Sequence, residues 1–235
     1  MSPHRDLPVG LSTRLPPGQR SVAWSRFGLP RFAHRVAPVP ERPVLQVRGA
    51  VAVPLDLDVA ELHQLTRYEQ TSTLHCVTTW STTGLTWSGV RFAEVLGYLT
   101  ELAEPAPTAD WLLLRGLDGY RCCLHRADAR RPSVLLADRV DGRPLTAAEG
   151  APLRLVAPEL YGYKGVRQLV GVEFATQPRA GSAGWAEHPR GRVALEERSP
   201  LLPGALWRVL WRAALPWVRL AYPPAPTGGP IRRQG

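Results

Sequence analysis

Short strand-like segments separated by turn residues dominate residues 42–174, and this pattern limits the fold more than any other feature of the chain. The segments are rich in Val, Leu and aromatic residues, and turn pairs such as Asp118-Gly119 and Asp141-Gly142 separate several of them. We expect strands over residues 44–53, 71–78, 111–114, 120–125, 134–137, 153–156 and 168–174.

Two segments of this region have helical patterns instead. Asp58 and Glu61 have the spacing of a capping box, which predicts a short helix that reaches about Tyr68. A second helix is expected from Val90 to Leu102, where apolar residues share one face. Many strands with few helices predict an α+β domain with mixed β-sheets and a few short helices.

The excess of basic over acidic residues indicates which kinds of partner the chain can bind. The 29 Lys and Arg residues exceed the 20 Asp and Glu residues, so the formal net charge is +9. A basic chain favours anionic partners, such as phosphate groups, an oxyanion substrate or a membrane surface. Because the chain has no recognised nucleic-acid motif and its arginines are spread evenly, we expect no nucleic-acid partner. The 44% hydrophobic content excludes a wholly disordered chain.

The cysteines predict a cytoplasmic protein with reduced thiols. Any disulfide scheme for Cys76, Cys122 and Cys123 leaves one unpaired. Adjacent strand residues alternate faces, so we expect one of Cys122 and Cys123 in the core and the other half-exposed. The N-terminus lacks the apolar stretch of a secretory signal, and no run of about eighteen uncharged apolar residues predicts a transmembrane helix.

The composition divides the chain into three segments. Residues 1–41 are rich in Pro and Arg, which predicts an extended arm wrapped on the core, and residues 42–177 form the folded domain. Residues 178–235 begin as an exposed Gly-, Arg- and Glu-rich linker and continue as a Trp/Arg amphipathic tail.

Residues 201–222 of this tail have the pattern of a helix with a basic stripe. Arg208, Arg212 and Arg219 lie within about 40° of one another at 100° per residue. Spanning a bilayer is disfavoured, since each arginine costs about 2.5–3.5 kcal/mol near its centre. We expect either a helix packed on its own domain or an interfacial helix that contacts a membrane or a hydrophobic partner. Pro216 should kink or end its first part.

Cys76 lies in the segment best suited to chemistry. It follows His75 at the expected end of a strand and precedes the hydroxyl residues Thr78, Thr79 and Ser81. A free cysteine is commonly a small buried hydrophobe. Neighbouring polar donors favour instead a thiolate that binds a metal or attacks a substrate. On an alternating strand His75 points away from Cys76, so a hydrogen-bonded structural histidine is expected there.

Further motifs surround this segment in a defined order. Cys76–Ser81 has the form Cys-Val-x-x-Trp-Ser, and Trp87–Val90 has the form Trp-x-Gly-Val. With these motifs the chain resembles, over residues 42–175, the molybdopterin-binding domain of the sulfite oxidase family, in particular its bacterial sulfoxide-reductase-like catalytic subunits. The other motifs that carry the resemblance lie at residues 47–54, 57–65, 117–120, 135–137, 141–145, 150–158 and 161–167.

The resemblance implies a sulfite-oxidase-type molybdopterin-binding fold and a molybdenum–molybdopterin (Mo-MPT) cofactor, with Cys76 as the protein ligand of the metal and the catalytic residue. A soft thiolate suits a metal that is already bound by sulfur. Guanidinium groups and backbone N–H groups suit the cofactor's phosphate. The residues expected to bind the cofactor are Arg154, Gly165, Val166 and Arg167, with Lys164 and Tyr163 of the same loop as further candidates.

Three positions depart from the family pattern. Glu149 replaces a common His or Asn, and its carboxylate would either repel a phosphate or accept pterin N–H bonds. Gly116 replaces a residue that often carries a hydroxyl group. Residues 26–34 match the family's pterin-covering loop only loosely.

The resemblance therefore predicts a bacterial molybdopterin-dependent oxidoreductase that performs two-electron oxygen-atom transfer on a small oxyanion or a sulfoxide. A separate electron-transfer protein is expected, since the chain lacks the family's haem domain; in the bacterial branch that protein is a membrane haem protein, to which the tail would dock. The alternative is a non-catalytic relative that serves as a cofactor-binding or membrane- and partner-docking module.

Overall fold

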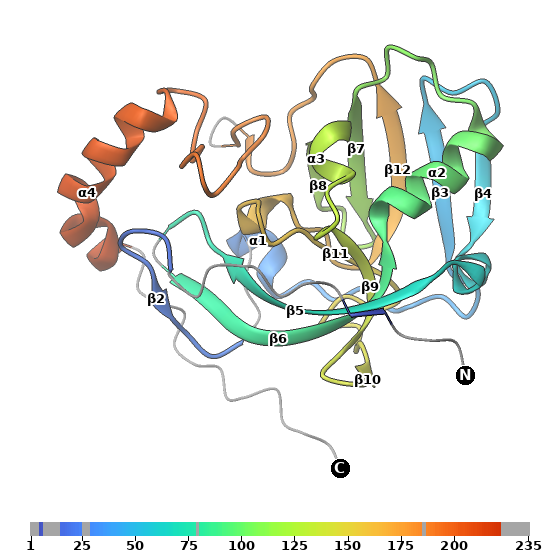
Figure 1. Cartoon of the computed structure of the whole chain (residues 1–235), viewed down its shortest axis with the longest axis horizontal. Coiled ribbons are helices and arrows are strands. Elements are labelled where there is room, and N and C mark those ends of the chain that lie inside the picture. The colour runs from blue at the N-terminus through green and yellow to red at the C-terminus, as the bar shows by residue number, and fades with distance from the viewer. Residues whose placement is uncertain (1–4, 7–14, 25–28, 79, 185–186, 222–235) are drawn as a thin grey trace.

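Two β-sheets form the body of the protein (Figure 1). The computed structural model describes residues 5–6, 15–24, 29–78, 80–184 and 187–221, and the statements below concern these residues. The first sheet contains β1 (Arg5–Asp6), β2 (Arg20–Ser21), β5 (Arg67–His75), β6 (Trp80–Arg91), β9 (Leu135–Val140), β10 (Arg143–Pro144) and β11 (Arg154–Val156). The second contains β3 (Val44–Gly49), β4 (Leu55–Asp58), β7 (Trp111–Gly116), β8 (Arg121–His125) and β12 (Leu169–Ala175).

Both sheets are mixed, which confirms the predicted α+β class. In the first sheet β5, β6 and β9 run antiparallel, while β1 and β2 add parallel pairs at β5 and β6. In the second sheet β12 pairs parallel with β3 and antiparallel with β7. The helices are α1 (Pro30–Ala33), η1 (Val59–Gln64), α2 (Phe92–Ala103), α3 (Arg126–Ala129), η2 (Gly162–Lys164) and α4 (Gly204–Ala221).

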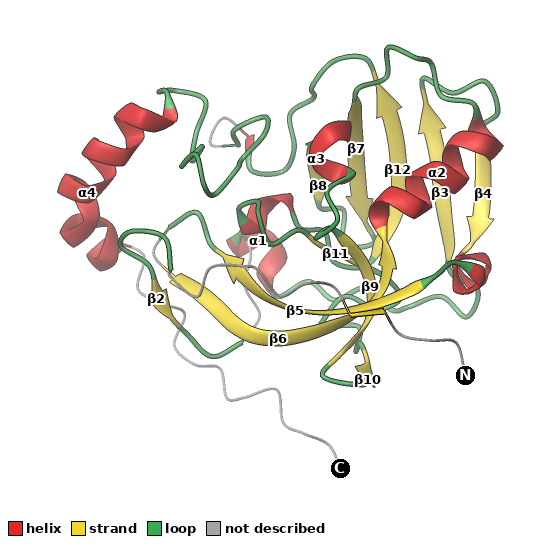
Figure 2. Cartoon of the chain, in the orientation of Figure 1, coloured by secondary structure: helices red, strands yellow, loops and turns green. Residues whose placement is uncertain are grey.

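Helix α2 covers the second sheet and contributes to the main core (Figure 2). Its side chains Val95, Leu96 and Leu99 are fully buried in one apolar cluster with Leu45 of β3 and Val172 of β12. This is the face that the sequence periodicity predicts, because residues three and four apart lie on one side of a helix. A second apolar cluster lies on the first sheet.

Two element predictions need correction. The capping box of Asp58 and Glu61 is present, but it starts a 3-10 helix that ends at Gln64 rather than near Tyr68, because the chain then enters β5. The segment 80–91 forms a long strand, β6, so that α2 begins at Phe92. Strand pairing with β5 and β9 on both sides outweighs the local helical pattern there.

Where the structure describes it, the N-terminal arm lies on the core, but Pro30–Ala33 form helix α1 rather than an extended segment. Residues of β1 and β2 pair with the first sheet, and the Gln19 side chain donates a hydrogen bond to the Cys76 carbonyl oxygen over 2.7 Å. The expected pterin-covering loop 26–34 lies partly outside the described residues, which resume at Leu29. The domain boundaries at 41/42 and 177/178 remain predictions.

The expected exposed linker is wrong for residues 187–199. Glu187, Glu196, Glu197, Arg198 and Ser199 are buried against the body of the protein. Ion pairs and backbone hydrogen bonds hold them there, which composition alone does not reveal. Cys123 is likewise buried rather than half-exposed, because this C-terminal segment covers β8: the Arg179 N–H lies 3.4 Å from the Cys123 Sγ.

Helix α4 runs without a break through Pro216, contrary to the prediction that a first helical piece ends there. Proline removes the hydrogen bond to the carbonyl oxygen of Arg212, but both residues are exposed, so water can satisfy that oxygen. None of the described helices is both long and apolar enough to cross a bilayer.

Candidate functional site

Cys76 occupies the turn between β5 and β6. Its backbone N–H donates to the Trp80 carbonyl oxygen over 2.9 Å, and its carbonyl oxygen accepts the hydrogen bond of Gln19. The antiparallel pairing of β5 and β6 closes this turn, with His75 opposite Ser81. The strand ends therefore hold the cysteine backbone from both sides, and the arm holds it from a third.

Hydrogen-bond donors surround the sulfur of Cys76. The Thr78 hydroxyl lies 3.2 Å from the Sγ atom. Although Cys76 keeps some exposure, burial raises the pKa of its thiol; the Thr78 hydroxyl, the N–H groups of Thr78 and Val77, and the charge of Arg198 oppose that rise. The pKa stays above its ordinary value because burial dominates, while these neighbours lower the cost of forming the thiolate that would bind a metal.

His75 is a structural residue, as predicted. Its Nδ1 atom lies 2.8 Å from the Ser81 Oγ atom and 3.3 Å from the Gln19 Oε1 atom. Burial lowers the pKa of His75 to about 4, which keeps the ring neutral at physiological pH. The neutral ring thus ties the arm to the two strands that carry Cys76.

Arg154 and Arg167 are two cations with little exposure to solvent, and Arg167 also lies 3.6 Å from the Asp118 carboxylate. Arg154 of β11 donates to the Glu149 carbonyl oxygen over 2.7 Å, and its Cζ atom lies 5.3 Å from the centroid of the Trp87 ring. Burial first, and the charge of Arg167 second, lower the pKa of Arg154 to about 9. Arg167 donates to the Phe32 carbonyl oxygen over 2.8 Å. A bound anion near both guanidinium groups would offset the cost of burying Arg154 and the repulsion between the two cations.

Two further features make this region fit a phosphate-bearing pterin. The Nε1 atom of the fully buried Trp87 has no hydrogen-bond partner among the described residues. Gly150 has a φ of +122°, and a Cβ atom there would lie 3.1 Å from the Arg154 side chain and 3.3 Å from the Arg167 Cα. The glycine thereby lets the backbone approach both cations.

The acidic departure from the family pattern is neutralised. The Glu149 carboxylate accepts two hydrogen bonds from Arg143, over 2.6 and 2.7 Å, and one from the Thr146 N–H over 2.9 Å. Burial alone would raise the pKa of Glu149, but these bonds outweigh it and hold the pKa below its usual value. The negative charge is thus compensated mainly by Arg143; Arg154 donates to the backbone carbonyl of Glu149 and also feels the charge of its carboxylate.

Gly116, the second departure from the family pattern, is explained by a lack of space for a side chain. A Cβ atom at this position would lie 2.6 Å from the Arg167 carbonyl oxygen and 2.8 Å from the Asp118 Oδ1 atom. The hydroxyl-bearing residue that the family often has there therefore cannot fit without a shift of the loop that carries Arg167.

The remaining predicted cofactor residues face elsewhere. Lys164 is fully buried, and its Nζ atom donates to the Cys123 and Pro189 carbonyl oxygens over 2.6 and 2.8 Å and to the Glu187 Oε1 atom over 2.9 Å. The Tyr163 hydroxyl donates to the Glu197 carbonyl oxygen over 3.2 Å. Both side chains thus contact the C-terminal segment, and a cofactor role for them stays a prediction.

The other two residues of that loop contribute backbone and packing. Gly165 lies where a Cβ atom would approach the Leu155 carbonyl oxygen to 3.3 Å. Val166 is fully buried in the main core, and its carbonyl oxygen accepts the Leu155 N–H over 2.8 Å. Their predicted contact with the cofactor remains open, while their place beside Arg167 is as expected.

Two residues near Cys76 were missed by sequence reasoning. Tyr161 is fully buried, and Arg198 donates a hydrogen bond to the carbonyl oxygen of Val77. Charge interactions connect each of them to Cys76. Arg198 lies in a Glu-Glu-Arg-Ser run that carries no distinguishing signal, since only the tertiary fold brings it to the Cys76 turn.

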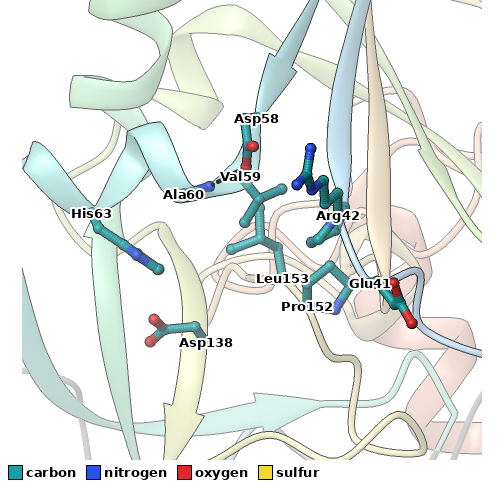
Figure 3. Close-up of a pocket in the computed structure, with 10 residues that line it drawn as sticks. Glu41, Arg42, Asp58, Val59, Ala60, His63, Asp138, Pro152 and Leu153 are labelled. Atoms are coloured by element: carbon teal, nitrogen blue, oxygen red, sulfur yellow. Dashed lines mark hydrogen bonds between the residues drawn. The ribbon is translucent and has the colours of Figure 1, made fainter.

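A separate cavity of about 340 Å3 lies beside η1, between the ends of the two sheets (Figure 3). Polar and charged side chains, including Arg42, His63 and Asp138, surround it, and Asp138 is paired with Arg67. It includes none of the predicted site residues. Among the described residues no three His, Cys, Asp or Glu side chains are grouped to hold a metal ion.

Comparison with known proteins agrees with these features. The family model of the oxidoreductase molybdopterin-binding domain matches residues 34–183. The uncharacterized oxidoreductase YuiH of Bacillus subtilis is 34% identical over 137 residues, which cover 58% of this chain and 67% of YuiH. The protein-methionine-sulfoxide reductase catalytic subunit MsrP of Xanthomonas campestris is 33% identical over 143 residues, 55% of this chain and 44% of MsrP.

The same fold occurs in a solved structure. The sulfane dehydrogenase SoxCD of Paracoccus pantotrophus superposes with a TM-score of 0.51 at 18% identity, over 70% of this chain and 43% of the SoxCD chain. The protein thus spans two thirds of YuiH but less than half of MsrP and of that SoxCD chain.

Proposed function

The chain belongs to the oxidoreductase molybdopterin-binding domain family, and from this premise we propose that it performs two-electron oxygen-atom transfer on a small sulfur-containing or other oxyanion substrate. The cofactor of this family is molybdenum–molybdopterin. The observation that carries the proposal is the donor-lined Cys76 turn, in a chain that also buries two arginines suited to a phosphate. When bound, the cofactor supplies the two-electron redox change.

The residues of the chain have distinct tasks in this proposal. Cys76 binds the metal through its thiolate, and the Thr78 hydroxyl orients and stabilises the sulfur. Arg154 and Arg167 bind the cofactor's phosphate, and Gly150 allows the close approach of the backbone. The neutral His75 keeps the arm over the Cys76 turn.

Metal analysis tests this proposal directly. Wild-type protein from a molybdenum-replete host should carry one molybdenum per chain, and Cys76→Ala should lose the metal or its activity. Arg154→Gln should reduce cofactor retention, whereas the exposed Arg139→Gln on β9 should not. A metal-free wild-type protein with normal folding would favour the alternative, a non-catalytic relative that serves as a docking module.

We propose that electrons are exchanged with a separate redox protein. One relative, MsrP, is named a catalytic subunit, which implies a second component in that system. The three free cysteines of this chain are consistent with the cytoplasmic location that we propose. A membrane haem protein is the partner class that this proposal favours, because α4 offers a surface suited to a membrane.

We also propose that helix α4 makes a peripheral contact with an anionic membrane surface. One side packs on the body of the protein, where the Trp207 Nε1 atom donates to the Ser199 carbonyl oxygen over 3.3 Å. Leu206, Val209, Trp217 and Leu220 lie within about 100° on the other side and are 48–77% exposed. Exposed large apolar side chains in such a stripe mark a contact surface.

The charge of α4 favours anionic lipid over a second copy of this basic chain. The helix contains three arginines and no acidic residue; Arg208 and Arg212 lie on one side of the apolar stripe, and Arg208 also pairs with Glu196 over 3.3 Å. Each basic residue near an anionic bilayer contributes about 1 kcal/mol. A helix with Trp and Leu on one face and Arg beside it fits the interface of a bilayer.

Vesicle sedimentation tests this contact. We expect binding to vesicles that contain phosphatidylglycerol and little binding to pure phosphatidylcholine. Val209→Glu and Trp217→Glu should abolish the binding, while Val53→Glu, at another exposed apolar position away from α4, should keep it. Dimers in light scattering together with no vesicle binding would show that a second copy covers the stripe instead.

A further inference from the structure

The C-terminal segment places one buried arginine, Arg198, against the Cys76 turn. Its Nη1 atom donates to the carbonyl oxygen of Val77, the residue after Cys76, across 121 positions of sequence. Arg198 is only 3% exposed. It lies beyond residue 183, where the match to the family model ends.

Aromatic rings hold the guanidinium of Arg198 from two sides. Its Cζ atom lies 4.3 Å from the Trp211 ring centroid of α4 and 5.2 Å from the Tyr161 ring centroid. Such cation–π contacts fix the plane of the group without using its N–H donors. The α4 helix and the loop before η2 thus orient one guanidinium beside the metal-binding cysteine.

Two of the three nitrogen atoms of the Arg198 guanidinium make no hydrogen bond to the described residues. The Nε and Nη2 atoms of Arg198 have no hydrogen-bond partner within the described part of the chain, and neither does the hydroxyl of Tyr161. Glu196 is an ion-pair partner of Arg198, but its Oε2 atom lies 3.8 Å from Nη2, too far for a hydrogen bond, so this pair compensates the charge and leaves these N–H groups without an acceptor in the described chain. Buried donors without acceptors are costly, which indicates that a ligand supplies the acceptor.

We propose that Arg198, together with the Tyr161 hydroxyl, binds an anionic oxygen of the substrate beside Cys76. The inference rests on the proposed function and deepens it, because a charged guanidinium fork selects an oxyanion over a neutral sulfoxide. Arg198 is thereby a substrate-binding residue that determines specificity, and α4 orients it through Trp211.

Anion binding to the holoprotein tests this inference without reference to turnover. The cofactor's own phosphate occupies Arg154 and Arg167 in the holoprotein, so inorganic sulfate reports on Arg198. Calorimetric titration should show sulfate affinity reduced about 10- to 100-fold in Arg198→Gln, the range expected for losing a hydrogen bond to a charged group. Tyr161→Phe should weaken sulfate binding less, and Arg139→Gln should leave it unchanged.

Four outcomes would overturn the inference. Sulfate affinity equal to the wild type in Arg198→Gln, with molybdenum retained, would leave the proposed function intact and remove the role of Arg198. If Arg198→Gln does not fold, Arg198→Lys is measured in its place. An unchanged sulfate affinity in Arg198→Lys would show that binding does not need the paired donors of a guanidinium group. A loss of dimethyl sulfoxide affinity as large as that for sulfate would refute selection for an anion. A wild-type protein without molybdenum would overturn the proposed function and this inference with it.

Discussion

Replacement of Lys164 by methionine separates a structural role from a cofactor role. Lys164 and Glu187 form an ion pair over 2.9 Å, with side-chain exposures of 0% and 4%. Methionine fills a similar volume but leaves the Glu187 carboxylate buried without its cation. It also removes the donor to the Cys123 and Pro189 carbonyl oxygens.

The burial of this ion pair allows an estimate of how much stability Lys164→Met loses. Breaking a buried ion pair by removal of one partner costs about 3–5 kcal/mol, because the remaining charge is uncompensated. The matched variant Arg48→Met breaks an ion pair with Asp56 in which both side chains are nearly half exposed, and pairs of this kind contribute about 0–1 kcal/mol. We therefore expect Lys164→Met to lower the free energy of unfolding several times more than Arg48→Met.

Urea denaturation followed by circular dichroism measures both changes. The double variant Lys164→Met/Glu187→Gln should regain part of the loss, because it removes the buried charge as well. A loss below about 1 kcal/mol in Lys164→Met would refute the structural role. If that variant also lost its molybdenum while fully folded, Lys164 would be a cofactor residue, as the resemblance suggests.

Two further predictions concern the departures from the family pattern. Because Arg143 holds the pKa of buried Glu149 below its ordinary value of 4.5, the stability that this pair contributes is present above that value and is lost as the pH falls through the lowered pKa. Melting temperatures measured from about pH 7 down to pH 3 should therefore fall less steeply in Glu149→Gln than in the wild type; parallel curves would refute the pairing. Gly116→Ser should lower stability by about 1–3 kcal/mol in thermal denaturation, since its Cβ atom would meet the Arg167 carbonyl oxygen at 2.6 Å. The control Gly97→Ser, where no atom lies within 4 Å, should be neutral or slightly stabilising, and equal stability of the two variants would contradict the steric explanation.

The local sequence predicts the parts of the fold that depend on periodicity. The apolar face of α2, the capping box at Asp58 and most strand positions follow from residues close together in the chain. The strand β6 does not, because its two neighbours in the sheet decide it. The Cys76 motif likewise indicates the chemistry directly, since the thiol and its hydroxyl neighbour Thr78 are two residues apart.

The tertiary structure alone decides which charges face each other. Lys164 and Arg167 are three residues apart in one loop, yet Lys164 is buried against Glu187 while Arg167 lies beside Arg154. Arg198 reaches the Cys76 turn across 121 positions, and no local pattern encodes that contact. Periodicity specifies which face of an element is buried. The partner of a buried charge is specified by where distant segments pack, because the cost of leaving that charge unpaired is met only in the complete fold.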